Sequence, residues 1–412
     1  MSSKHLTRFI VAGMLLGLCV GFICYRFFPD SSAGFAAAAG LLPTMFLRLI
    51  KMIIAPLVLA TLISGIARMG DGSAIGRVGL KAMLWFVSAS LLSLTLGLLL
   101  VNFFAPGKNL QLSLPAANAQ SHIATSNLSI VNFIEHTIPT SIFDAMARNE
   151  ILQIVVFAIF FGIAMAALGE RNKPLLDIVD ALAQIMLKVT GYVMQFAPLA
   201  VFGALVNTVA KEGLGIVAIY GVFMGEFYFS MLMLWLLLIA GGAVIIGPRV
   251  LQLMREVREP LLLAFSTASS EAAYPKTLES LERFGCSNKV ASFVLPLGYS
   301  FNLDGSMLYC TFAVLFIAQA YGIDLSAGQQ IMMLAILMLT SKGIAGVPRA
   351  SLVVIAATLN QFNIPEAGLL LLLGIDHFLD MGRSATNVVG NSIAAAVVSK
   401  WEGEIAPAAT KL

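Results

Sequence analysis

The sequence predicts an all-α polytopic membrane protein. Of its 412 residues, 59% are hydrophobic and only 11% are charged, whereas about a quarter of the residues in a soluble globular chain are charged. Apolar runs long enough to cross about 30 Å of hydrocarbon recur along the whole chain. Inside one of them lies a strongly polar helix, 374–391. The charge content, the repeated apolar runs and this polar helix together indicate a membrane protein with a built polar site.

Six apolar spans are expected in the first 250 residues, with Gly, Pro or charged residues at their connections. They are 9–28, 41–69, 81–104, 151–168, 174–210 (interrupted at Gly191 and Pro198) and 215–246. The first run follows Lys4 and Arg8 as in a signal peptide, but many spans follow it, so we expect a retained helix. The polar stretch 106–129 has no periodicity and is expected to be an external loop, followed by broken helix over 130–148.

Basic residues mark alternate connections. They precede the first span, separate the second from the third, and follow the fourth and sixth: Lys4, Arg8, Arg68, Arg77, Lys81, Arg171, Lys173, Arg249, Arg255 and Arg258. Cytoplasmic loops carry such an excess of Lys and Arg. We therefore expect both termini in the cytoplasm and a multi-pass protein of a bacterial-type inner (plasma) membrane. This scattered charge is a topology signal and excludes a nucleic-acid partner.

After residue 248 the pattern changes to short arms. The apolar segment 260–268 ends in a Ser-rich tip at Ser266–Glu271, and 272–289 returns as an amphipathic helix. Neither arm is long enough to span the hydrocarbon, so we expect a re-entrant hairpin. Its tip is tolerated at membrane depth only if it is buried in protein or lines a cavity.

A broken span follows this hairpin, and the pair of elements occurs twice. The span 290–321 is interrupted over 298–305, where Asn302 and Asp304 lie mid-membrane. Then 329–339, a Gly/Pro/Ser tip at 340–351 and 352–362 form a second hairpin, and 368–400 forms the last span. Paired interrupted segments indicate a transporter binding site; two unrelated kinked helices are the alternative.

The polar helix carries its charged and amide side chains on one face. Asp376, Asp380, Arg383, Asn387 and Asn391 are spaced by 4, 3, 4 and 4 residues, which places them within about 80° of one another. Charges in hydrocarbon cost several kcal/mol unless they face protein, water or a ligand. The face therefore indicates a transport or relay site, with a purely structural buried ion pair as the alternative.

These residue types suit an acidic amino acid. Arg383 offers a fork of donors for a carboxylate, and Asp380 can accept an ammonium group; the alternative is that they pair only with each other. Hydrogen-bonding walls are expected from Ser270, Ser306, Ser384 and Asn387, and hard oxygen ligands for a small cation from Asn302, Asp304, Asn387 and Asn391.

Other chemistries find no support in the sequence. It contains no nucleophile–base pair, no zinc or redox spacing among its four cysteines and no phosphate loop, so we expect neither an enzyme nor an organic cofactor. His377 and Glu271 are titratable, but a packing histidine and a helix N-terminal acid are the plainer interpretations. Arg48 and Lys51 are interpreted as packing or interface residues.

Four motifs resemble those of the dicarboxylate/amino acid:cation symporters, which include glutamate and aspartate transporters. They are Ser269-Ser-Glu-Ala-Ala-Tyr-Pro275, Asn302-Leu-Asp-Gly305, Gly343-Ile-Ala-Gly-Val-Pro348 and Asp376-His-Phe-Leu-Asp-Met-Gly-Arg383. The resemblance implies eight transmembrane helices, two re-entrant hairpins, inverted repeats, a lipid-embedded homotrimer and elevator-like sliding. It implies scaffold helices in 1–174, with the third helix moving with the transport domain, then helices five and six in 175–250 and a transport core in 251–412.

The resemblance also implies residue roles. The substrate contacts would be Ser269, Ser270, Ser306, Val347, Ser351, Asp380, Arg383, Ser384 and Asn387. The candidates for ion or proton coupling would be Ser90, Gly298, Ser300, Asn302, Asp304, Asn387, Asn391, Glu271 and Asp376, with sodium at Gly298, Asn302, Asn387 and Asn391. Relatives specific for C4-dicarboxylates commonly lack the acid at Asp380, so its presence favours glutamate or aspartate.

The departures from the family pattern concern the ion. Sodium-coupled members carry an aspartate where this chain has Asn391, and the third span has Phe86 and Ala89 where polar groups are expected. Because fewer oxygen ligands weaken a cation site, proton coupling is expected, with sodium as a further coupling ion. Arg349 adds a base that could favour a dianion, so a C4-dicarboxylate symporter is the alternative; an anion channel is a third interpretation.

Overall fold

The computed structural model describes residues 3–69, 72–108, 137–212, 220–340, 350–373 and 375–406. Within these ranges the chain is helical, apart from turns and one isolated β-bridge between Cys286 and Ile405. Seven of the described helical segments are long and apolar enough to cross a membrane. The predicted all-α polytopic class is thus confirmed.

The first half forms the predicted spans and one helix more. In order they are α1 (Ser3–Phe27), α2 (Pro29–Ala39), α3 (Leu41–Met69), α4 (Gly72–Phe104), α6 (Ile142–Arg148), α7 (Ile151–Leu168), η1 (Gly169–Asn172), α8 (Lys173–Val193), η2 (Met194–Phe196), α9 (Ala197–Glu212) and α11 (Gly221–Ile246). α2 was not predicted; Pro29 starts it at the first helical position, where a missing N–H costs nothing. The predicted external loop lies mostly in 109–136, outside the described residues.

The second half contains the first predicted hairpin and the broken span. It runs through α12 (Arg249–Glu256), α13 (Arg258–Thr267), η3 (Glu271–Ala273), α14 (Tyr274–Phe284), α15 (Asn288–Phe301) and α16 (Asp304–Ala320). Two short apolar helices, α17 (Ala327–Thr340) and α18 (Ala350–Gln361), form the arms of the second hairpin. The last span, predicted over 368–400, is divided into η5 (Glu366–Gly368), α19 (Leu369–Leu373) and α20 (Asp376–Trp401).

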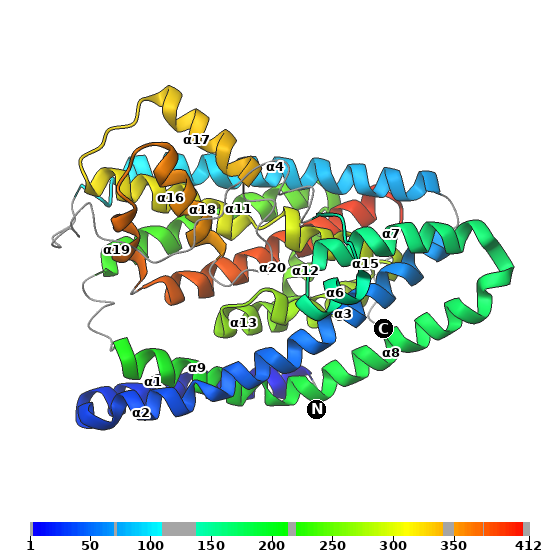
Figure 1. The fold of residues 1–412 in the computed structure, drawn as a ribbon, viewed down its shortest axis with the longest axis horizontal. Coiled ribbons are helices and arrows are strands. Elements are labelled where there is room, and N and C mark those ends of the chain that lie inside the picture. Colours follow the sequence, from blue (N-terminus) through cyan, green and yellow to red (C-terminus); the bar gives the residue numbers. More distant parts are fainter. Residues whose placement is uncertain are drawn as a thin grey trace.

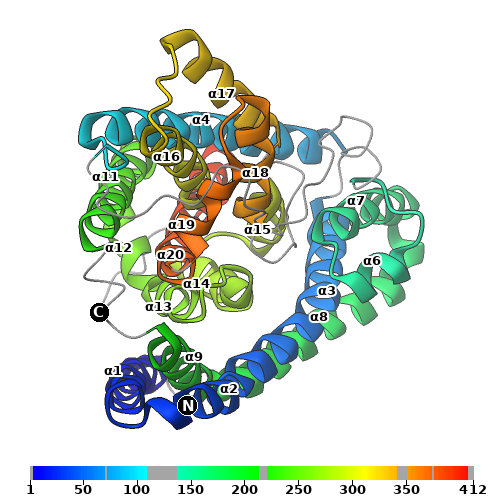
Figure 2. The same cartoon turned by 60° about the vertical axis from the view of Figure 1, so that its left-hand side comes forward.

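Two groups of helices are visible in the molecule. α20 is central and packs against α4, α11, α13, α15 and α16, while α3 packs against α7, α8 and α9, and α1 against α9 (Figure 1). In Figure 2 the helices α1, α2, α3, α6, α7, α8 and α9 form an arc along one side of the body around α20. We call these groups the arc and the body; contacts of α3 and α7 with α15, and of α9 with α13, join them.

Close glycine packing holds one end of the arc. Gly13, Gly17 and Gly21 are spaced by four residues on α1 and face α9. A Cβ at Gly17 would lie 2.8 Å from the carbonyl oxygen of Phe202. Small residues at this spacing let two membrane helices approach closely.

The end of α20 is fixed to the start of α4. The carboxylate of Glu402 accepts hydrogen bonds from Arg77 Nη2 at 2.9 Å and Lys81 Nζ at 2.7 Å. One residue earlier, the Trp401 ring meets the Trp85 ring edge to face, with centroids 6.2 Å apart. We call the contacts of Glu402 with Arg77 and Lys81 the terminal clamp.

Candidate functional site

The charged end of the polar face is a buried cluster on the first two turns of α20. Arg383 Nη2 lies 3.2 Å from Asp376 Oδ1 and 2.9 Å from Asp380 Oδ1. The Arg383 residue is 1% exposed. Its Nε and Nη1 atoms have no hydrogen-bond partner within the described part of the chain. The acids thus share one corner of the guanidinium and leave donors on the other two nitrogens.

The amides of the polar face connect α20 to the break between α15 and α16. Asn387 Oδ1 accepts the Gly305 N–H at 2.9 Å, and Asn387 Nδ2 donates to Ser306 Oγ at 3.3 Å. One turn further along, Asn391 Oδ1 accepts from Asn302 Nδ2 at 3.2 Å. The predicted polar face and the predicted broken span therefore meet.

Asp304 at the start of α16 is fully buried and held by two elements. Its Oδ2 accepts from Asn302 Nδ2 at 3.0 Å, and its Oδ1 accepts from Ser93 Oγ of α4 at 3.2 Å. Ser90, which the sequence analysis singled out, donates instead to the Phe301 carbonyl at 3.5 Å. Ser93 was missed; it lies three residues after Ser90 on the same helix face, and that spacing could have identified it.

Two glycines let these oxygen atoms approach the backbone. A Cβ on Gly298 would collide with the Asn391 amide oxygen, and one on Gly390 would collide with a carboxylate oxygen of Asp304. The Gly298 carbonyl also accepts the Asn302 N–H at 2.7 Å. Asn302 Oδ1 is a buried acceptor without a hydrogen-bond partner among the described residues. This group of oxygens has the hard character that a small cation requires.

The first hairpin tip is closed by its own hydroxyls. Ala268 ends α13 in the left-handed conformation (φ 49°), and Ser269 Oγ accepts the Ala272 N–H at 3.2 Å. Thr267 and Ser270 are both 8% exposed. The tip is thus buried in protein, as a re-entrant segment requires, and α13 packs against α20.

Only part of the second hairpin can be placed. Val347, Arg349 and the motif 343–348 lie outside the described residues. Ser351, at the start of α18, accepts a weak bond from the Cys310 thiol of α16, with Sγ and O 3.9 Å apart. This contact joins the second hairpin to the broken span.

The predicted substrate and ion residues fall into two groups along α20. The first group, nearer the start of α20, consists of Asp380, Arg383, Asn387 and Ser306. The second group, further along the helix, consists of Gly298, Asn302, Asp304 and Asn391. Of the four predicted sodium ligands, Asn387 is separate, because its amide is used by Gly305 and Ser306. Ser384 and Ser300 are buried, and Ser300 Oγ has no hydrogen-bond partner among the described residues. His377 is half-buried, with its ring edge-on to Phe378.

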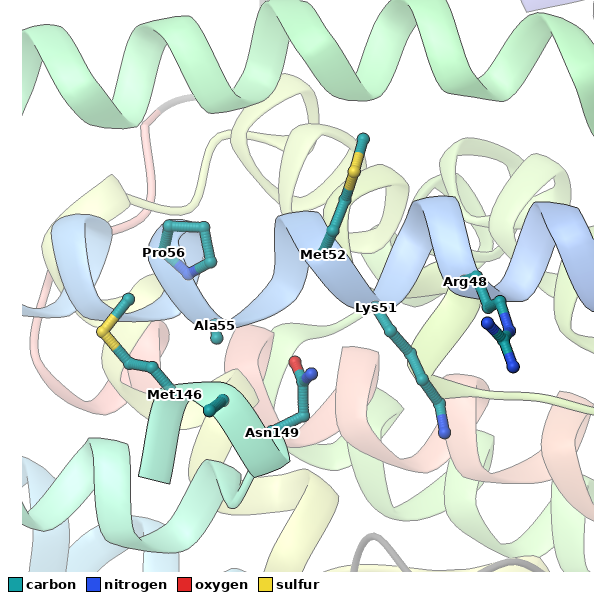
Figure 3. A pocket seen from close by; sticks show the side chains of 8 residues that line it. Arg48, Lys51, Met52, Ala55, Pro56, Met146 and Asn149 are labelled. Carbon is teal, nitrogen blue, oxygen red and sulfur yellow. The ribbon is translucent and has the colours of Figure 1, made fainter. Parts of the chain in front are cut away.

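A cavity of about 510 Å³ lies apart from the polar face, between α3 and α6. It is lined by Arg48, Lys51, Met52, Ala55, Pro56, Met146, Ala147 and Asn149 (Figure 3). Lys51 and Glu150 both interact electrostatically with Glu271 at the first hairpin tip. All of the lining residues belong to the arc, and Arg48 and Lys51 give the cavity a basic character.

Comparison with known proteins agrees with this architecture. Residues 6–401 match the sodium:dicarboxylate symporter family. The chain is 41% identical over 400 residues to a proton/sodium-glutamate symport protein of Bacillus caldotenax, covering 96% of this chain and 94% of the relative. It is 42% identical over 401 residues to a C4-dicarboxylate transport protein of Rhodospirillum rubrum, covering 96% and 87%. The chain belongs to the sodium:dicarboxylate symporter family.

Proposed function

We propose that the protein is a secondary-active symporter that imports glutamate or aspartate together with protons. The observation that carries this proposal is the pair Asp380–Arg383. The Arg383 side chain is 2% exposed and that of Asp380 is 33% exposed, and they lie 2.9 Å apart. A buried guanidinium beside an accessible carboxylate suits a ligand with a side-chain carboxylate and an ammonium group. Ser306 and Asn387 add neutral hydrogen-bonding groups on the same side.

The ion end of α20 supports the proposal of proton coupling. Asn391 supplies a neutral amide oxygen beside Asn302 and the Gly298 backbone, so the group has one negative charge, on Asp304. Fewer anionic oxygens weaken a sodium site. The unpartnered Asn302 Oδ1 supports one weak sodium site beside proton coupling.

Import of C4-dicarboxylates is the second candidate. Relatives named for glutamate symport and for C4-dicarboxylate transport match at nearly equal identity, 41% and 42%. Both substrate classes contain two carboxylates that Arg383 and the hairpin tips could bind. Only the amino acids also carry an ammonium group, so only they would need the Asp380 carboxylate for binding.

We further propose an elevator-type motion of a homotrimer in a bacterial inner membrane. In this proposal the arc is the static scaffold with the subunit contacts, and the body, including α4 and α11, carries the substrate. The packing of α20 against the body helices, and of α3 against α7 and α8, supports this division, and the contact of α3 with α15 is the surface along which the two groups would slide.

The test is uptake into proteoliposomes. Labelled glutamate, aspartate and succinate would be offered under separate proton and sodium gradients. We expect accumulation of an acidic amino acid driven by a proton gradient. Accumulation driven only by sodium would contradict proton coupling, and succinate uptake without competition by aspartate would contradict the amino-acid substrate. Flux without saturation or accumulation would indicate a channel.

A further inference from the structure

The two acids beside Arg383 have different surroundings. Both contact Nη2, at 3.2 Å from Asp376 and 2.9 Å from Asp380. The side chain of Asp376 is only 3% exposed, whereas that of Asp380 is 33% exposed. A ligand entering the site could reach Asp380 but not Asp376 without rearrangement.

Tyr309 on α16 locks the inner acid in place. Its ring lies under the guanidinium, with Arg383 Cζ 4.0 Å from the ring centroid. Its hydroxyl donates to Asp376 Oδ1 at 3.2 Å, the same oxygen that accepts from Arg383. The ring itself is fully buried and held edge-on by Phe227, with centroids 5.6 Å apart. Arg383, Asp376 and Tyr309 thus form a closed triangle of contacts.

The triangle bears on the charge balance of Arg383 while a ligand binds. An uncompensated buried guanidinium costs several kcal/mol. If Asp380 were the sole counter-charge, a ligand ammonium group that recruited Asp380 would compete directly with Arg383 for it. Asp376 keeps one negative charge on Arg383 throughout.

We propose that Asp376 and Tyr309 are positioning residues that provide Arg383 with a fixed counter-charge, so that Asp380 can exchange from Arg383 to the ammonium group of the ligand. This rests on the proposed function, and it gives the site a basis for discriminating amino-bearing from amine-free dicarboxylates. Without the charge of Asp376, Asp380 becomes the only acid on Arg383 and is retained there. The site also gains one positive charge, which favours a dianion.

The experiment measures inhibition of labelled aspartate uptake by unlabelled aspartate and by succinate in proteoliposomes. We expect Asp376→Asn to raise the ratio of the aspartate to the succinate inhibition constant by about tenfold or more, which corresponds to about 1.4 kcal/mol. Weaker aspartate binding and newly measurable succinate binding would both contribute. Tyr309→Phe keeps the stacked ring but removes the hydrogen bond to Asp376, so it should shift the ratio in the same direction by less. Asp376→Glu should restore part of the wild-type ratio.

The controls separate this inference from the proposed function. Asp177→Asn, an exposed carboxylate on α8, should leave the ratio at its wild-type value. Size-exclusion profiles would show whether each variant assembles, and Tyr309→Phe keeps the test open if Asp376→Asn does not. An unchanged ratio in both variants would overturn the inference, as would loss of proton-driven accumulation at an unchanged ratio, since that would assign Asp376 to proton transfer. Failure of the proposed function would instead appear in the wild-type protein, as absent aspartate and glutamate uptake.

Discussion

Arg383 has the most demanding environment of any residue in the polar face. It is 1% exposed, yet two of its nitrogens have no hydrogen-bond partner in the described residues. Arg383→Ala should reduce uptake of acidic substrates to background, because removing the donor of a buried charge-assisted pair costs several kcal/mol of binding. The transporter should still assemble, as size-exclusion chromatography would show. Arg148→Ala, which removes an exposed base on α6, is the matched control, and wild-type uptake by Arg383→Ala would exclude Arg383 as the substrate clamp.

We predict that the amide of Asn391 weakens sodium binding at the ion end of α20. Asn391→Asp would place a second negative charge beside Asn302, Gly298 and Asp304, and anionic oxygens strengthen sodium binding. We expect the half-saturating sodium concentration for uptake to fall by about tenfold. The measurement is uptake at fixed pH over a range of sodium concentrations, with Asn391→Gln, which keeps a neutral amide, as the control. Equal sodium dependence in both variants would show that position 391 does not contact the ion.

At the residue scale the sequence predicted which polar side chains of α20 share one face, but only some of their contacts. The spacing of Asn387 and Asn391 placed them on one face, and both contact the broken span as expected. The contact of Asp376 with Tyr309 joins residues 67 positions apart, and no periodicity specifies such a pair. The role of Asp376, left open by the sequence, depends on this tertiary contact.

At the scale of the elements, α1 packs closely against α9 through its glycines. Gly17→Leu should lower the melting temperature of the purified protein, because the added side chain would meet the Phe202 backbone and Leu205. Overpacking of this kind costs about 1–3 kcal/mol. Gly34→Leu on α2 is the control, since no atom lies within 4 Å of a Cβ there. Equal melting temperatures for the two variants would mean that α1 can move away from α9 at no cost.

Pro and Gly marked some element boundaries but not all, because the interruption expected at Gly191 is absent and that residue lies inside α8. Pro198 lies just after the short 3-10 turn between α8 and α9, and Gly298–Gly305 spans the break between α15 and α16. The polar helix was predicted from residue 374, and α20 begins at Asp376. The separate helix α19 (Leu369–Leu373) was not predicted, because its apolar run contains neither proline nor glycine.

For the whole molecule, the terminal clamp ties the two ends of the body together at one surface. The hydrogen bond from Arg77, with that from Lys81, holds the pKa of Glu402 below its ordinary value of 4.5. Because the unfolded carboxyl has the ordinary pKa, the clamp stabilises the fold fully above that pH and loses this contribution as the pH falls through the lowered pKa. Such pairs contribute about 1 kcal/mol or less.

The expected result is a melting temperature that is higher in the wild type than in Glu402→Gln at pH 7. The difference should shrink as the pH falls below the ordinary carboxyl pKa of 4.5 and through the lower pKa of the folded Glu402 carboxyl. Asp324→Asn, at the exposed contact with Lys108, is the control and should show a smaller difference at every pH. A difference that grows on acidification would contradict the assigned direction of the pKa.

The break between α15 and α16 has a consequence for the energetics of transport. Asn387 binds the peptide at Gly305, and Asn391 binds Asn302, three residues earlier. If the substrate binds at Asn387 and the ion at Asn391, as proposed, both act on the break between α15 and α16 from positions one helical turn apart. By thermodynamic linkage, if bound ion changes the affinity for substrate by some factor, bound substrate changes the affinity for the ion by the same factor. Titrating the substrate with and without the ion would measure that factor. A factor of one would mean that substrate and ion bind independently.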